Sequence, residues 1–165
     1  MLRTISLATV FSLSLMAVSG PALSQGTNIA FGNFRQDSSL PVEITSDQLS
    51  VDQTSGQATF NGNVLIAQGE MRLGAEGVDV IYSDDGGKIS KLLATGDVIV
   101  TNAGETAEAQ NAEYDLESGT ITLSGRVLLT QGQSALSGER MVIDLATGTG
   151  RMDGRVKTIL QPGNN

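Results

Sequence analysis

The sequence predicts an all-β protein whose single antiparallel sheet is built from four repeats of 29–34 residues and folded over along its length. Three observations support this fold class. The chain has 20 glycines but only 3 prolines, and it is rich in threonine and valine, as expected of short strands joined by tight turns. Apolar and polar residues alternate with period two, and the same segment pattern recurs along the chain. No window of a dozen residues shows a helical stripe.

The first 24 residues have the layout of a secretory signal peptide. Arg3 precedes an apolar run at 5–18, and A-L-S at 22–24 is a small-x-small cleavage site. We therefore expect cleavage near Ser24–Gln25 and a mature protein in the periplasm. An uncleaved membrane anchor is the alternative, but the apolar run is short for a span that needs about 20 residues.

The composition argues against several classes of function. With no cysteine and no histidine, the chain lacks the commonest metal ligands and the commonest general base, so we expect neither a metal site nor a cofactor. A net charge of −8 and an aromatic content of 4% argue against nucleic acid as a partner. The sequence contains no phosphate-binding G-x-x-x-x-G-K-[ST] motif, so we expect no ATP site of this kind.

The repeats lie in a predicted domain at 41–161, between a flexible lead-in at 25–40 and a tail at 162–165. Each repeat has a glycine inside an alternating segment: FNGNV, ATGDV, LSGRV and MDGRV. These glycines are Gly62, Gly96, Gly125 and Gly154, spaced 34, 29 and 29 residues apart. Periods of this length are typical of stacked repeats.

The central glycine of each repeat lies on the apolar face of its segment. Phe60 and Val64 flank Gly62 on this face, and Met152, Val156 and Leu160 continue the pattern in the last repeat. Glycine weakens a strand unless the backbone bends or is closely approached there, so the stacked glycines predict a bend along the whole sheet. A parity change in the facing segments predicts a bulge at the same level. The folded sheet would enclose an apolar trough, which could also be an ordinary packed core.

Several segments resemble the OstA-like domain family. They are ITSDQLSVD at 44–52, GQATFNGNV at 56–64, AEAQNAEYD at 107–115 and LSGERMVID at 136–144. The resemblance covers 41–160 and implies a V-shaped, semi-open β-jellyroll whose groove shields the acyl chains of lipopolysaccharide. It also implies copies joined head to tail into a bridge, which runs from an inner-membrane anchored partner to the N-terminal domain of the outer-membrane lipopolysaccharide translocon.

The resemblance implies a lipid-binding groove, and the alternation selects the residues that would line it. The glycine-containing segments contribute Phe60, Val64, Ile66, Val98, Val100, Ile121, Leu123, Val127 and Leu129. The facing segments contribute Val80, Tyr114 and Ile143, of which Tyr114 is equally interpretable as a buried structural ring.

An open sheet also leaves unpaired edges, which add a strand from another chain readily. We expect such an interface at Ile44, Leu49 and Val51 at one end, and at Arg155, Val156, Lys157 and Ile159 at the other. Residues 37–117 carry 15 acidic and 3 basic side chains, whereas 118–165 carry 3 acidic and 5 basic ones. Opposite charge at the two ends favours head-to-tail contact, although it is also consistent with charge that only keeps the protein soluble.

Three other interpretations compete with a lipid carrier. An enzyme would need a carboxylate pair such as Asp84–Asp85, or carboxylates at Asp47, Glu76 and Glu139, but the first has the composition of a turn and the others recur once per repeat. The segment SDDGG also lacks the ligand spacing of a calcium loop. A structural β-repeat protein that binds no lipid would share the stacking, and the membrane-anchored partner in the same family would keep its N-terminal hydrophobic segment.

Overall fold

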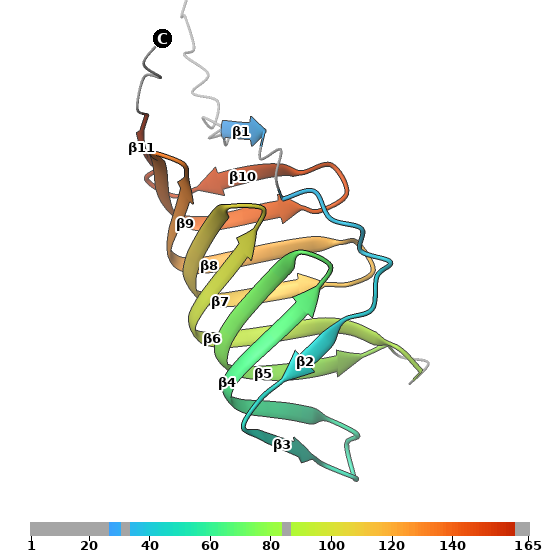
Figure 1. Ribbon diagram of the computed structural model, residues 1–165. Helices are drawn as coiled ribbons and strands as arrows, with labels where there is room; N and C mark the ends of the chain where they lie inside the picture. The colour runs from blue at the N-terminus through green and yellow to red at the C-terminus, as the bar shows by residue number, and fades with distance from the viewer. Residues whose placement is uncertain (1–26, 31–33, 84–86, 161–165) are drawn as a thin grey trace, which may run out of the picture.

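The computed structural model describes residues 27–30, 34–83 and 87–160. Within these ranges every regular element is a β-strand, and Figure 1 shows one continuous sheet. This confirms the all-β prediction. The strands are β1 (Thr27–Ala30), β2 (Glu43–Thr45), β3 (Gln48–Val51), β4 (Ala58–Gln68), β5 (Met71–Tyr82), β6 (Ile89–Asn102), β7 (Glu105–Asp115), β8 (Thr120–Gln131), β9 (Ser134–Asp144), β10 (Thr149–Asp153) and β11 (Lys157–Ile159).

The sheet has eleven strands in the order β1-β10-β9-β8-β7-β6-β5-β4-β2, with β3 also paired to β4 and β11 also paired to β9. Every pair is antiparallel, and from β4 to β9 each strand pairs with the next one along the chain. The two ends do not meet, so the sheet stays open. Its terminal strands are β2 and β3 at one end, and β1 and β11 at the other.

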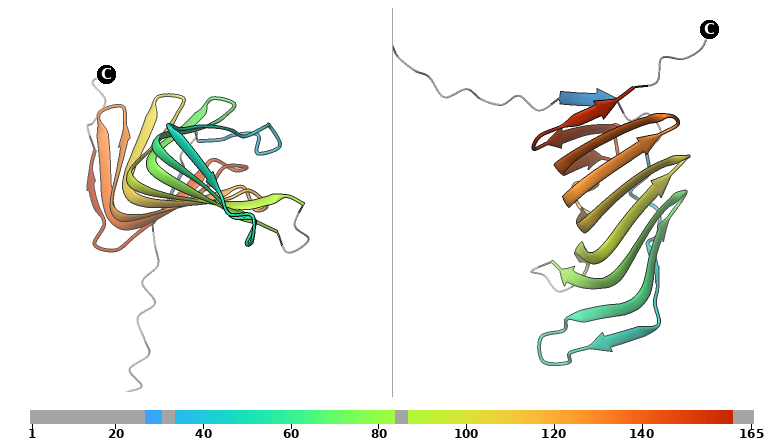
Figure 2. Two further views of the ribbon diagram at one scale, coloured as in Figure 1. Left: turned by 90° about the horizontal axis from the view of Figure 1, so that it is seen from below. Right: turned by 90° about the vertical axis from the view of Figure 1, so that its left-hand side faces the viewer.

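A sharp bend divides the sheet lengthwise into two arms and gives it the cross-section of a V (Figure 2). At the bend, β4, β6 and β8 each carry a glycine followed by a second residue, both with positive φ: 77° and 45° at Gly62–Asn63, and 81° and 50° at Gly125–Arg126. The strand ladder shifts register at this level, for example between Asn61 and Val64. The predicted bend at the glycines and the interruption of pairing beside them are confirmed.

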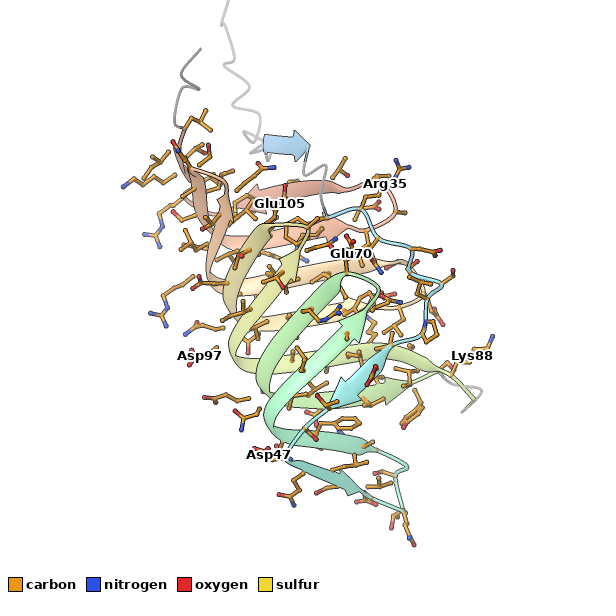
Figure 3. The ribbon with its side chains drawn as sticks, in the orientation of Figure 1. Arg35, Asp47, Glu70, Lys88, Asp97 and Glu105 are labelled. Carbon is orange, nitrogen blue, oxygen red and sulfur yellow. The ribbon has the colours of Figure 1, made fainter. Side chains whose placement is uncertain are left out.

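A side chain from the neighbouring segment of the chain covers each bend glycine. A Cβ at Gly62 would lie 2.7 Å from Asp47 Oδ2, and one at Gly96 would lie 2.8 Å from Glu76 Cβ. Gln110 and Glu139 occupy the equivalent positions over Gly125 and Gly154. Figure 3 shows Asp47 on the outside of the bend. The carboxylates that recur once per repeat therefore each pack against a separate bend, which is the arrangement of a scaffold.

The two arms end in different kinds of connection. The first arm, which includes β2 and β11, ends in two-residue hairpin turns, such as Ala103–Gly104 with φ of 45° and 90°. These left-handed values suit the twist of a tight hairpin. The second arm, which includes β1, β3 and β10, ends in longer turns. In three of these an aspartate closes the turn. Asp52 Oδ1 accepts the Thr54 N–H at 2.7 Å, Asp115 Oδ1 accepts that of Ser118 at 2.9 Å, and Asp144 Oδ1 accepts that of Ala146 at 2.9 Å.

The hydrophobic core lies between the arms. Met152, at the start of the last predicted apolar series, is fully buried, but Val156 and Leu160 are 39% and 71% exposed. The prediction that all three continue the buried face is therefore wrong for the last two. Strand β10 ends at Asp153, and Val156 and Leu160 flank β11, which within the described residues pairs only with β9 and so forms an edge of the sheet.

Some predictions fall outside the described residues. They are the signal peptide at 1–24 with its cleavage site, the pair Asp84–Asp85, and the tail at 162–165. Of the predicted lead-in at 25–40, the structure describes 27–30 and 34–40. In the described part of the chain, no helix is long and apolar enough to cross a membrane.

Candidate functional site

The inward faces of the two arms form continuous apolar rows that cross the sheet. On the first arm, the register places Ile66 beside Leu73, which is followed by Val100, Ala107, Leu129 and Leu136 on successive strands. Each of these six side chains is at most 3% exposed. Val64, Val98 and Val127 lie beside the bend and are also buried. All six residues of the row are aliphatic, so the inward face of this arm carries no ring and no polar group along the row.

The second arm carries two such rows. One contains Val80, Leu92, Tyr114, Ile121 and Ile143, and the other contains Phe60, Val78, Ala94, Ala112, Leu123 and Met141. Eleven of the twelve residues predicted to line a groove are buried on the inward faces, while Phe60 is partly buried and packs against the core. The prediction omitted Leu73, Leu92, Leu136 and Met141, although the alternation places Leu92 on the same face.

Residues 34–42, here called the strap, cross the open side of the V between β1 on the second arm and β2 on the first (Figures 1 and 2). Near its start, the Gln36 N–H donates to the carbonyl of Leu145 at 2.9 Å, in a turn of the second arm. The Gln36 side-chain amide donates to the carbonyl of Gln68 at 2.7 Å, at the tip of the first arm. The strap therefore holds both arms, and Phe34 at its start is fully buried in the core.

Gln68 links the strap and both arms beneath it. Its side-chain nitrogen donates to the carbonyls of Ser38 and Leu40, at 3.0 and 2.8 Å, and its Oε1 accepts a hydrogen bond from the Tyr114 hydroxyl. Gln68 is 1% exposed and Tyr114 is not exposed. Burial raises the pKa of the Tyr114 hydroxyl, which stays protonated and donates. Tyr114 thus has a structural contact in addition to its place in an inward row.

A second group of polar side chains is buried near the tip of the first arm. Glu105 is 1% exposed and accepts a hydrogen bond from the Gln131 side chain. Its Oε2 and the Nδ2 of Asn102 have no hydrogen-bond partner among the residues that the structure describes. Burial raises the pKa of the Glu105 carboxyl, because the charged form loses its hydration. Figure 3 shows Glu105 and Glu70 near the hairpins of this arm and Arg35 on the strap.

The predicted edge residues lie on the terminal strands. Ile44 is half-buried on β2, whereas Leu49 and Val51 on β3 are 54% and 58% exposed. At the other end, Lys157 and Ile159 are exposed on β11, and Arg155 and Val156 are exposed just before it. Strand β1 pairs with β10, so at this end the edge of the second arm belongs to the N-terminal segment.

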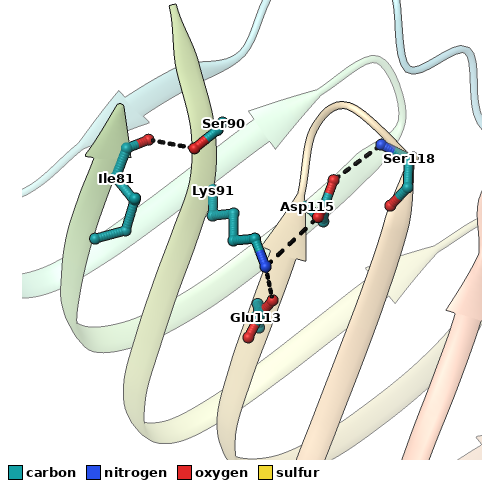
Figure 4. Close-up of polar contacts among 6 residues, drawn as sticks. All are labelled: Ile81, Ser90, Lys91, Glu113, Asp115 and Ser118. Atoms are coloured by element: carbon teal, nitrogen blue, oxygen red, sulfur yellow. Dashed lines mark hydrogen bonds and ion pairs between the residues drawn. The ribbon is translucent and has the colours of Figure 1, made fainter. Parts of the chain in front are cut away.

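The outer face carries isolated polar contacts. Figure 4 shows Lys91 Nζ between Glu113 and Asp115, at 2.6 and 3.6 Å. The hydrogen bond to Glu113 raises the pKa of Lys91, and the Ser118 N–H lowers that of Asp115. Among the described residues there is no cluster of three or more His, Cys, Asp or Glu side chains that could hold a metal ion. The ion pairs of Lys91 therefore join β6 to β7 on the outer face.

An open, V-shaped antiparallel sheet with a largely aliphatic interior defines this chain as an all-β repeat fold. The family model described as "LptA/(LptD N-terminal domain) LPS transport protein" matches residues 43–149. This chain therefore belongs to that lipopolysaccharide-transport family, and the resemblance recognised in the sequence is confirmed.

Known relatives agree with the family assignment. The lipopolysaccharide export system protein LptA of Escherichia coli (strain K12) is 28% identical over 145 residues, covering 83% of this chain and 72% of that protein. An uncharacterised protein of Rhizobium meliloti (strain 1021) is 25% identical over 164 residues, covering 93% of this chain and 88% of that protein.

Solved structures share the fold, and the crystal structure of LptH is among them. The crystal structure of LptH, described as the LptA-homologous periplasmic component of the lipopolysaccharide transport device of Pseudomonas aeruginosa, superposes with a TM-score of 0.68. The match covers 77% of this chain and 99% of that one, at 17% sequence identity. It confirms the architecture of the sheet.

Proposed function

We propose that this protein is a periplasmic lipopolysaccharide-binding bridge that shields acyl chains between its two arms and passes the lipid from the inner to the outer membrane. The observation that carries the proposal is the set of aliphatic rows that run across consecutive strands from β4 to β9 inside an open sheet, in a chain of the lipopolysaccharide-transport family. Burial of each acyl CH₂ against such walls is worth about 0.8 kcal/mol. The protein acts as a passive conduit and performs no catalysis.

The terminal strands support head-to-tail assembly. An exposed β3 with Leu49 and Val51 and an exposed β11 with Ile159 offer backbone groups and apolar side chains at opposite ends of the sheet. The acidic side chains concentrate in residues 37–117 and the basic excess lies in 118–165, so joining opposite ends brings opposite charges together. The same edges would pair with an inner-membrane anchored partner and with the N-terminal domain of the outer-membrane translocon.

The test is equilibrium binding of fluorescently labelled lipopolysaccharide to the purified protein and to two charge variants. Phe60→Asp places a carboxylate on the inward face, at a position that is only partly buried and therefore tolerant of change. Leu65→Asp is the matched control, because Leu65 lies on the same strand, points outward and is 41% exposed. We expect saturable binding that is lost in Phe60→Asp and retained in Leu65→Asp, with both variants folded by circular dichroism.

The second candidate is a structural β-repeat protein of the cell envelope with no lipid ligand. The observation that favours it is the burial of the inward rows, which leaves their side chains no more accessible than an ordinary core. Assembly without any binding of lipopolysaccharide by the unmodified protein would establish this alternative and end the carrier proposal.

A further inference from the structure

The strap closes the side of the V through which a bound lipid must extend. A lipid with its acyl chains between the arms leaves its sugar headgroup in water, and along the length of the V the headgroup must extend through the open side, since both walls are hydrogen-bonded sheet. The strap follows this side from Leu145 on the second arm to Gln68 on the first. Phe34 occupies apolar space in the core between the arms.

The strap is fixed by fewer contacts than the strands around it. It makes no ladder with either arm, and Arg35, Asp37, Ser38, Ser39 and Leu40 are all exposed. Among the described residues, its ties to the arms include five hydrogen bonds, made by Arg35, Gln36 and the carbonyls of Ser38 and Leu40, together with the buried ring of Phe34. Segments with little buried surface and few backbone hydrogen bonds open before the core does.

We propose that the strap is a displaceable lid that competes with acyl chains for the interior of the V. This inference rests on the proposed function and adds a closed state, in which Phe34 and Gln68 seal the interior, and an open state that admits lipid. Lipopolysaccharide binds the open state alone and shifts the population toward it. The closed state protects the aliphatic rows from water and from other apolar ligands while no lipid is present.

A removable crosslink tests the lid directly. A Cβ at Gly119, in a turn of the second arm, would lie 3.5 Å from the Cβ of Ser38 on the strap. Disulfides join Cβ atoms about 3.5–4.5 Å apart, and the chain contains no cysteine that could compete. The variant Ser38→Cys/Gly119→Cys therefore locks the strap when oxidised and frees it when reduced.

The probe is fluorescently labelled lipopolysaccharide, and the readout is its affinity for the same protein sample before and after reduction. We expect the oxidised form to bind at least tenfold more weakly than the reduced form. The single variants Ser38→Cys and Gly119→Cys are the controls, because both meet the oxidant and neither can form the crosslink. Equal affinity of the oxidised and reduced double variant overturns the lid while leaving the carrier proposal intact. Absence of binding by the unmodified protein overturns the carrier proposal, and the lid with it.

A second experiment uses a variant whose strap is held by fewer hydrogen bonds. Arg35→Ala/Gln36→Ala removes its side-chain hydrogen bonds to Ala146 and Gln68. Ser39→Ala is the matched control, because the hydrogen bonds of Ser39 are to Asp37, within the strap. We expect lipopolysaccharide to associate several-fold faster with the double variant than with the control. Equal or slower association would contradict a lid that limits entry.

Discussion

The bend glycines should be far more sensitive to substitution than glycines of the same backbone conformation elsewhere. Gly125→Ala places a methyl group at φ of 81°, where the left-handed backbone alone costs about 1–2 kcal/mol. The new Cβ would also lie 2.9 Å from the Cβ of Gln110, an atom that rotation of the glutamine side chain cannot move. Overpacking of this kind adds about 1–3 kcal/mol, so we expect a total loss of roughly 2–5 kcal/mol in the free energy of unfolding.

Gly132→Ala is the matched control for this prediction. Gly132 has a φ of 57°, but nothing lies within 4 Å of its Cβ position, so this variant should lose only the backbone part, about 1–2 kcal/mol. Urea unfolding followed by circular dichroism measures both variants. If Gly125→Ala is no more destabilised than Gly132→Ala, the close approach of Gln110 does not define the bend.

Three further predictions concern burial and charge. Leu129→Ala, on an inward row, should lower the free energy of unfolding by about 2–5 kcal/mol. Leu128→Ala changes the preceding residue, which is 37% exposed, and should alter the free energy of unfolding by less than about 0.5 kcal/mol. Equal urea midpoints for the two variants would contradict the assignment of inward and outward faces on β8. Burial raises the pKa of Glu105, so its contribution to stability is full below the unfolded pKa of about 4.3 and is lost as pH rises through the folded pKa. Glu105→Gln should therefore gain stability relative to the parent protein as pH rises above about 4.3, and a gain independent of pH in urea titrations would refute this. Head-to-tail oligomers measured by analytical ultracentrifugation should shrink as salt rises, and indifference to salt would show that the charge asymmetry has no role in assembly.

Strand alternation and the recurring glycines were sufficient to predict the sheet, its bend and the inward face of the residues chosen for the groove. These features are local, because an alternation of period two and a left-handed glycine each depend on only a few consecutive residues. The exposure of Val156 and Leu160 was not predictable in this way, since it depends on whether another strand follows.

The strap and its contacts were not predictable from the sequence pattern. Its contacts reach single residues in separate turns, from Leu145 to Gln68, so they leave no periodicity. The buried Gln68 continues the inward parity of Val64 and Ile66, and a polar residue in such a series was the one available signal. Its partner Tyr114 lies 46 positions away and no spacing rule joins the two.

Photo-crosslinking of lipopolysaccharide at matched inward and outward positions tests the central claim most directly. A benzophenone amino acid replaces Phe60, whose own ring faces inward, or Leu128, which faces outward. If the interior of the V holds acyl chains, lipopolysaccharide will crosslink at position 60 and not at position 128. Crosslinking at 128 alone, or equally at both positions, would contradict a lipid site between the arms.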